Sequence, residues 1–161
     1  MPEREPSLLD DLYREILLNH YRSPRNKGTL DAPTCSADGA NPLCGDEIHL
    51  EVELEDGAID AVRFTGTGCS ISQASASMMT EYVAGKTVAA ADRAVDDFQR
   101  MMIEGASPVD DFGDIEALVG VAKFPARVKC ASLAWKTLRQ ALEHPDIAEP
   151  VTTDDRSANH G

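Results

Sequence analysis

Hydrophobic residues that recur at three- and four-residue steps predict a largely helical chain. The first helix follows Ser7, a capping residue that pairs with Asp10, and it ends before Pro24, where a loop begins. Similar spacing predicts further helices over 71–84, over 87–105, from Asp114 to the residues before Phe124, and from Pro125 to Leu142.

Strict alternation of apolar and polar residues predicts one β-hairpin. Apolar side chains occupy every second position over 47–55, Asp56-Gly57 supplies a turn, and a return strand covers 59–64. Between Gly28 and residue 47 we find no strong pattern. Because so small a hairpin is unstable without helices packed on it, the sequence predicts an α+β fold with a small antiparallel β-sheet packed against several α-helices.

The chain length and the composition of its end predict one domain and a tail. With 161 residues, 42% of them hydrophobic, the chain is long enough for one domain. Residues 146–161 are rich in Pro, Asp, Thr, Ser and Asn, and this composition predicts a disordered tail after a single domain over 1–145.

Charge and cysteine content narrow the class of function. A net charge of −13 argues against binding to nucleic acid or to an anionic membrane. Neither a signal peptide nor a run of ~18 apolar residues is found, so we expect a cytoplasmic protein. Four cysteines would suggest two disulfides in a small secreted domain, but a reducing compartment favours metal binding or thiol chemistry.

Three of the cysteines lie at the edges of predicted elements. Cys44 lies in the turn before the hairpin, Cys69 at a helix start and Cys130 early in the last helix, while Asp46 follows two residues after Cys44. The free N–H groups at the helix start favour the Cys69 thiolate. Three thiolates and a carboxylate suit tetrahedral zinc or an iron-sulfur cluster, and because no C-x-x-C pair is present, the spacing alone leaves the metal open.

The other candidate residues have weaker indications. Cys35 matches no motif and is interpreted as an incidental free thiol, while His20 and His49 stand where structural histidines are common. Basic residues beside the cysteine loops form either a docking surface for a partner or solvated loops; they are Arg22, Arg25, Lys27, Lys123, Arg127 and Lys129.

The cysteine motifs resemble those of the U-type iron-sulfur assembly proteins. The segments that carry the resemblance are Asn41-Pro-Leu-Cys-Gly-Asp46, Gly66-Thr-Gly-Cys-Ser-Ile-Ser-Gln-Ala-Ser75 and Phe124-Pro-Ala-Arg-Val-Lys-Cys-Ala131, together with His20-Tyr-Arg-Ser-Pro-Arg-Asn26. The long interval between Cys69 and Cys130 is typical of the SufU branch. Lys129 stands where the IscU branch has a histidine ligand, a role that a protonated lysine cannot fill.

The resemblance implies a SufE/IscU-like fold and a zinc ion held by Cys44, Asp46, Cys69 and Cys130. It also implies that Cys44, in a turn that can move, accepts persulfide sulfur from a pyridoxal-phosphate (PLP) cysteine desulfurase of the SufS kind. Because a zinc-bound thiolate is a poor nucleophile, Cys44 would first leave the metal, and a histidine of the desulfurase would take its place. Arg127 would steer the partner or hydrogen-bond a metal ligand.

On this interpretation the chain is a partner and activator of the desulfurase rather than a stand-alone enzyme, and it passes sulfur on to downstream Suf assembly proteins. Two alternatives remain. One is a scaffold that binds iron and assembles a transient [2Fe-2S] cluster on the same residues, and the other is a passive zinc-stabilised domain.

Overall fold

The computed structural model describes residues 8–143 and 151–152, and the side chains of residues 10–143. Its helices are α1 (Leu8–Arg22), α2 (Ser70–Val83), α3 (Val88–Ile103), the 3₁₀ helix η1 (Gly113–Lys123) and α4 (Pro125–Glu143). Its strands are β1 (Cys35–Asn41), β2 (Asp46–Glu55), β3 (Ala58–Thr67) and β4 (Val151–Thr152).

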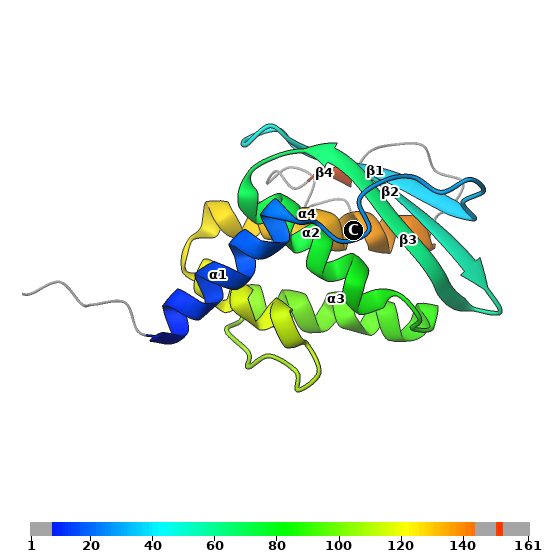
Figure 1. Cartoon of the computed structure of the whole chain (residues 1–161). Coiled ribbons are helices and arrows are strands. Elements are labelled where there is room, and N and C mark those ends of the chain that lie inside the picture. The colour runs from blue at the N-terminus through cyan, green and yellow to red at the C-terminus, as the bar shows by residue number, and fades with distance from the viewer. Residues whose placement is uncertain (1–7, 144–150, 153–161) are drawn as a thin grey trace, which may run out of the picture.

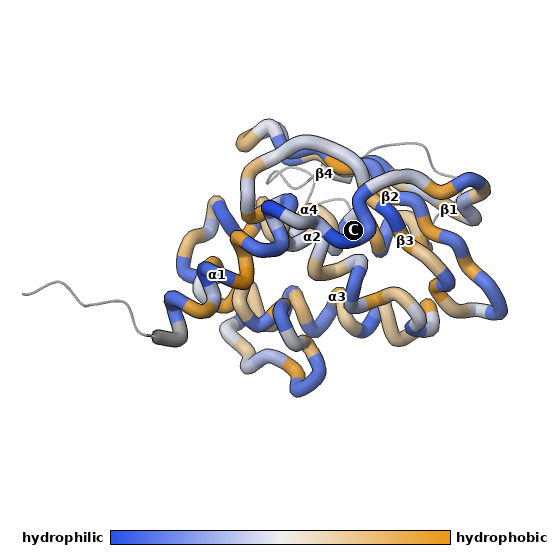
Figure 2. The backbone as a smooth tube through the Cα atoms, viewed as in Figure 1, coloured by the Kyte–Doolittle hydropathy of each residue, from blue (hydrophilic) through white to orange (hydrophobic). Residues whose placement is uncertain are grey.

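The strands form one sheet in the order β3-β2-β1-β4. β1, β2 and β3 pair antiparallel, and β4 joins β1 in parallel. Figure 2 shows hydrophobic and hydrophilic residues alternating along β2 and β3, which is the pattern that predicted the hairpin. Asp56 and Gly57 form its turn with φ values of 53° and 77°. The α+β fold predicted from the sequence is therefore confirmed.

Helices cover one face of the sheet in two layers (Figure 1). α4 packs on β1 and β2, α2 packs on β3, and α3 lies beyond them against α4 and η1. Between α3 and α4 the rings of Phe98 and Trp135 stack with their centroids 4.3 Å apart. Because α2 lies in the middle layer, its residues 72–80 are all buried, and the small side chains among them allow neighbouring helices to approach closely.

His20 joins three elements that are distant in sequence. Its ring is fully buried, with Nδ1 2.7 Å from the Ser77 hydroxyl of α2 and Nε2 2.9 Å from the Asp114 carboxylate of η1. The Ser77 oxygen also accepts a hydrogen bond from the Arg25 backbone N–H, 2.8 Å away. These contacts hold α1 and the loop after it against α2, which gives His20 the structural role that its position suggested.

The sequence pattern did not predict β1. This strand covers Cys35–Asn41, in the stretch between Gly28 and residue 47 for which no element was expected. Its inward positions carry Cys35, Ala37, Gly39 and Asn41, which are too small or too polar to give a hydrophobic alternation. Small residues are required here because α4 lies so close. A Cβ on Gly39 would stand 2.1 Å from the Thr137 hydroxyl oxygen.

The bounds of the other predicted elements differ less from those in the structure. The return strand continues to Thr67 instead of ending at Phe64, and the short helix predicted from Asp114 is the 3₁₀ helix η1. Ser7 lies outside the described residues, as does the predicted tail apart from Val151 and Thr152, which form β4. Among the described helices, none has the length and apolar character that crossing a membrane requires.

The glycine at position 66 is required by a close backbone contact. Its φ is +144°, and an added Cβ would stand 2.1 Å from the Glu47 carbonyl oxygen of β2. We expect Gly66→Ala to lower the free energy of unfolding by about 3 kcal/mol, measured by urea denaturation. Gly57→Ala is the matched control, because Gly57 also has a positive φ but open space around it, and it should cost about 1–2 kcal/mol. Equal losses in the two variants would contradict the steric explanation.

Candidate metal centre

Cys44 lies in an exposed turn between β1 and β2. The Asn41 carbonyl oxygen accepts hydrogen bonds from the backbone N–H groups of Cys44 at 3.2 Å and Gly45 at 2.9 Å. Gly45 has φ +72°, a left-handed conformation that glycine adopts without strain. The turn therefore presents the Cys44 side chain to solvent at the end of a firmly paired strand.

Asp46, the first residue of β2, is fully buried. Its Oδ1 accepts a hydrogen bond of 2.9 Å from the backbone N–H of Cys69. Gly68 makes this approach possible, because a Cβ there would stand 2.6 Å from the same oxygen. The carboxylate thus ties the start of β2 to the start of α2.

Cys130 lies in the second turn of α4 and is only 2% exposed. Its Sγ is 3.4 Å from the Sγ of Cys44, and Asn41 Nδ2 donates to it from 3.8 Å. Burial raises the pKa of the Cys130 thiol well above its ordinary value, and the hydrogen bond with Cys44 and the charges of Cys69 and Asp46 raise it further. Without a metal, this thiol is therefore protonated at neutral pH.

Three of the four expected ligands come together in the structure. A sulfur from Cys44, a sulfur from Cys130 and a carboxylate oxygen from Asp46 all lie within 4.8 Å of one another. Cys69 is not part of this group. It is the N-cap of α2, as predicted, and its sulfur accepts a hydrogen bond of 3.5 Å from the Ser72 N–H. The role of Cys69 as fourth ligand stays a prediction.

The unsatisfied atoms of the group fit a cation. Asp46 Oδ2 is buried, and no hydrogen-bond partner for it exists within the described part of the chain. A buried carboxylate oxygen without a partner costs free energy that a bound cation would offset. Two thiols and one carboxylate form a donor set that suits zinc, and iron binds the same ligands.

Asn41 is a site residue that the sequence analysis did not single out. Its backbone carbonyl shapes the Cys44 turn, its Nδ2 faces the Cys130 sulfur, and its buried Oδ1 has no hydrogen-bond partner among the described residues. The feature of the sequence that could have indicated Asn41 is its position at the start of the Asn41-Pro-Leu-Cys-Gly-Asp46 motif.

Arg127, the remaining predicted site residue, and Cys35, interpreted from the sequence as an incidental thiol, are not members of this group. Arg127 is exposed one turn before Cys130, and among the described residues its side chain has no hydrogen-bond or ion-pair partner. Cys35 is buried on β1, and burial raises the pKa of its thiol, as expected of an unreactive cysteine. The role of Arg127 stays a prediction.

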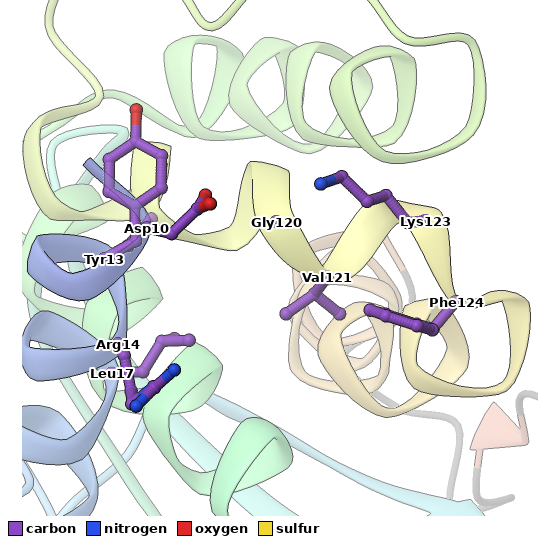
Figure 3. Close-up of a pocket in the computed structure, with 9 residues that line it drawn as sticks. Asp10, Tyr13, Arg14, Leu17, Gly120, Val121, Lys123 and Phe124 are labelled. Atoms are coloured by element: carbon purple, nitrogen blue, oxygen red, sulfur yellow. The ribbon is translucent and has the colours of Figure 1, made fainter. Parts of the chain in front are cut away.

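A hollow elsewhere on the surface has fewer reactive side chains than this group. A hollow of about 470 Å³ lies between α1 and η1, with Tyr13, Leu17, Val121 and Phe124 on its walls (Figure 3). Its polar lining consists of Asp10, Arg14 and Lys123, and no cysteine or histidine lines it. The group at Cys44, Asp46 and Cys130 is therefore the candidate functional site.

Comparisons with known proteins show the family of the chain. The family described as the NifU-like N terminal domain matches residues 12–144. The chain is 48% identical over 136 residues to the zinc-dependent sulfurtransferase SufU of Bacillus subtilis, covering 83% of this chain and 91% of that protein. It is 39% identical over 147 residues to the iron-sulfur cluster assembly scaffold protein IscU of Streptococcus pyogenes, covering 91% of this chain and 92% of that protein.

A solved structure shows the same fold. It is the SufU of Fervidobacterium islandicum, described as a scaffold protein for iron-sulfur cluster assembly in the SUF system. Its TM-score is 0.75 at 34% sequence identity, and the match covers 80% of this chain and 95% of that one.

The unpartnered oxygen of Asp46 leads to a prediction about metal affinity. Asp46→Asn keeps an Oδ1 acceptor for the Cys69 N–H but loses the negative charge, so we expect zinc to bind roughly tenfold more weakly or worse. Competition with a chromogenic chelator measures the affinity. Glu47→Gln, which alters the exposed neighbouring carboxylate, is the matched control and should bind zinc as the wild type does. Unchanged affinity in Asp46→Asn would exclude this carboxylate as a ligand.

The raised pKa of Cys130 leads to a second prediction. Because the metal-free thiol is protonated at pH 7, zinc binding must displace its proton. At saturating zinc, Cys130→Ala should release about one proton fewer per zinc than the wild type does. A pH-stat in weakly buffered solution measures this number, and equal release by the two proteins would show that Cys130 does not bind the ion as a thiolate.

Proposed function

The chain belongs to the family of the NifU-like N terminal domain and is an iron-sulfur cluster assembly protein of the IscU/SufU kind, and from this premise we propose that it is a zinc-dependent sulfur-transfer protein. In this role it accepts persulfide sulfur on Cys44 from a cysteine desulfurase and passes it on. The observation that carries the proposal is the placement of an exposed Cys44 sulfur 3.4 Å from the buried sulfur of Cys130.

Accessibility supports Cys44 as the acceptor within the group. Cys44 is exposed, whereas Cys130 and Asp46 are buried, so a persulfide carried on another protein reaches the Cys44 sulfur first. Cys69 is committed to the helix start through its contact with Ser72. The exposed side chain of Leu43, next to Cys44, adds an apolar contact for a partner at this turn.

The transfer is a thiol-disulfide exchange on a persulfide. The Cys44 thiolate attacks the outer sulfur of the desulfurase persulfide, a new S–S bond forms at Cys44, and the desulfurase cysteine leaves as a thiolate. Cys44, Asp46, Cys130 and Cys69 would hold the zinc ion, whose charge would keep the three cysteine thiols deprotonated at neutral pH. The chain itself contributes the exposed turn that carries Cys44 and the buried residues that hold the two ends of this turn in place.

The partner implied by this role is a PLP-dependent cysteine desulfurase, with downstream Suf assembly proteins as recipients. Arg127 stands exposed at the start of α4, close in sequence to Cys130, where a cation would steer an acidic partner towards the site. A location in the cytoplasm, where these partners would meet the chain, belongs to the same proposal.

A scaffold role on the same residues is the second candidate. It is supported by the 39% identity to a protein named as an IscU scaffold, and by a donor set that also binds iron. Lys129, partly buried on α4 beside Cys130, offers no ligand while protonated, which favours sulfur transfer. Anaerobic reconstitution with iron and sulfide separates the two, because only a scaffold gives a stable chromophore that Asp46→Ala destroys.

The acceptor role of Cys44 is tested by removing its sulfur. We expect Cys44→Ala to accept no sulfur from a desulfurase supplied with cysteine, while its circular dichroism spectrum stays that of the wild type, because Cys44 is exposed in a turn. Peptide mass spectrometry under anaerobic conditions measures the added sulfur. Cys35→Ala is the control and should still be modified at Cys44. Full sulfur uptake by Cys44→Ala would refute the assignment.

The dependence of sulfur uptake on zinc is tested in a second arm of the same experiment. Zinc-loaded and zinc-stripped samples are offered the desulfurase in parallel, and the zinc-loaded sample is expected to gain sulfur at Cys44 while the stripped one does not. Equal or better uptake by the stripped protein would favour the scaffold role.

A further inference from the structure

The closeness of two sulfur atoms suggests how the transferred sulfur leaves. We propose that Cys130 is a resolving thiol, which attacks the Cys44 persulfide at its inner sulfur, releases the outer sulfur as sulfide and leaves a Cys44–Cys130 disulfide. This inference rests on the proposed function, because it starts from sulfur carried on Cys44. It adds an activity to the chain, namely the reductive release of sulfide without a docked recipient.

The distance between the two sulfurs favours this reaction. The Sγ atoms of Cys44 and Cys130 are 3.4 Å apart, although 86 residues separate them in sequence. A disulfide bond is about 2.05 Å long, so closing the gap requires a movement of roughly 1.4 Å. Cys44 lies in the exposed turn 42–45, which can supply this movement while the buried start of α4 stays fixed.

The direction of approach selects the inner sulfur as the point of attack. Cys130 is buried and contacts the Cys44 sulfur from the protein side, whereas Cys44 is exposed to solvent. The outer sulfur of a Cys44 persulfide therefore extends away from Cys130, towards solvent. Attack at the inner sulfur is then close to in line with the bond that breaks, as thiol-disulfide exchange requires.

The neighbours of Cys130 hold its sulfur in position for this attack. Asn41 Nδ2 lies 3.8 Å from the Cys130 sulfur and the Ala126 carbonyl oxygen 3.6 Å from it. Asn41 also shapes the turn that carries Cys44, so one residue positions both reacting sulfurs. The other two cysteines are less suited, because Cys69 caps α2 and Cys35 is buried in β1, opposite Val52 of β2.

The atoms and electrons of the step balance without an external oxidant. The Cys130 Sγ forms a bond to the Cys44 Sγ as the bond between Cys44 and its outer sulfur breaks. The outer sulfur takes the electron pair and leaves as hydrosulfide. Where Cys130 starts as a protonated thiol, its proton goes to this leaving group, and where it starts as the thiolate that zinc would favour, no proton is transferred. Both cysteines are oxidised by one electron, and the sulfane sulfur is reduced by two. A cellular dithiol reductant must then reduce the disulfide before the next cycle.

The test follows sulfide and disulfide together. Zinc-loaded, full-length protein is persulfidated anaerobically by a desulfurase and cysteine, which are then removed by gel filtration. Free sulfide is measured with time, and non-reduced peptides are analysed by mass spectrometry. We expect equimolar sulfide and Cys44–Cys130 disulfide. In Cys130→Ser the persulfide should remain on Cys44, with sulfide release roughly tenfold slower or more.

A further variant shows whether a thiol outside the pair takes part. Cys35→Ser removes a thiol outside the site and should release sulfide as the wild type does. If Cys130→Ser takes up no sulfur from the desulfurase, inorganic polysulfide is used to load Cys44 directly, with the wild type loaded in the same way.

The outcomes separate this inference from the proposed function. If the desulfurase places no sulfur on Cys44 of the wild type, the proposed function fails, while polysulfide loading still tests the resolving role. If Cys44 carries a persulfide that persists, or that is lost at the same rate in Cys130→Ser, the resolving role is wrong. Sulfur found on Cys130 as a persulfide would show attack at the outer sulfur and would also overturn it.

Discussion

The hydrogen bond from the Cys69 backbone N–H to the buried Asp46 carboxylate is the constraint on which the site depends. It joins the first residue of β2 to the start of α2, and the absence of a side chain at Gly68 is what lets the two approach. Because one carboxylate oxygen is used in this way, the other is left buried and without a hydrogen-bond partner among the described residues. The same contact that positions the elements therefore leaves a buried acceptor on a carboxylate that lies within 4.8 Å of the sulfurs of Cys44 and Cys130.

Around this hydrogen bond, the site consists of a buried part and an exposed part. Cys130 and Asp46 are buried on α4 and β2, where packing and pairing fix them, while Cys44 lies on an exposed turn. Under the proposed sulfur transfer, such a division would let the exposed cysteine meet a partner while the buried residues stay in place. The chain is 48% identical to a protein named as a sulfurtransferase and 39% identical to one named as a scaffold, so it resembles both kinds of protein.

Most elements could be predicted from the sequence because their periodicity is strong. The hairpin and α3 each bury one face, so apolar residues mark that face at regular steps. β1 could not be found in this way, since its inward positions are shaped by the close approach of α4 and carry small residues such as Gly39. The signal that a strand usually gives is absent where the packing leaves no room for large side chains.

The residues available for chemistry, the α+β class and the positions of the cysteines at element edges, Cys69 at the start of α2 among them, follow from the sequence alone. Which of these residues meet depends on how the elements pack. Cys44 and Cys130 come within 3.4 Å across 86 residues of chain, and Asn41 becomes part of the site. The physical reason is that periodicity records which face of an element is buried, whereas distances between side chains are set by how the elements pack.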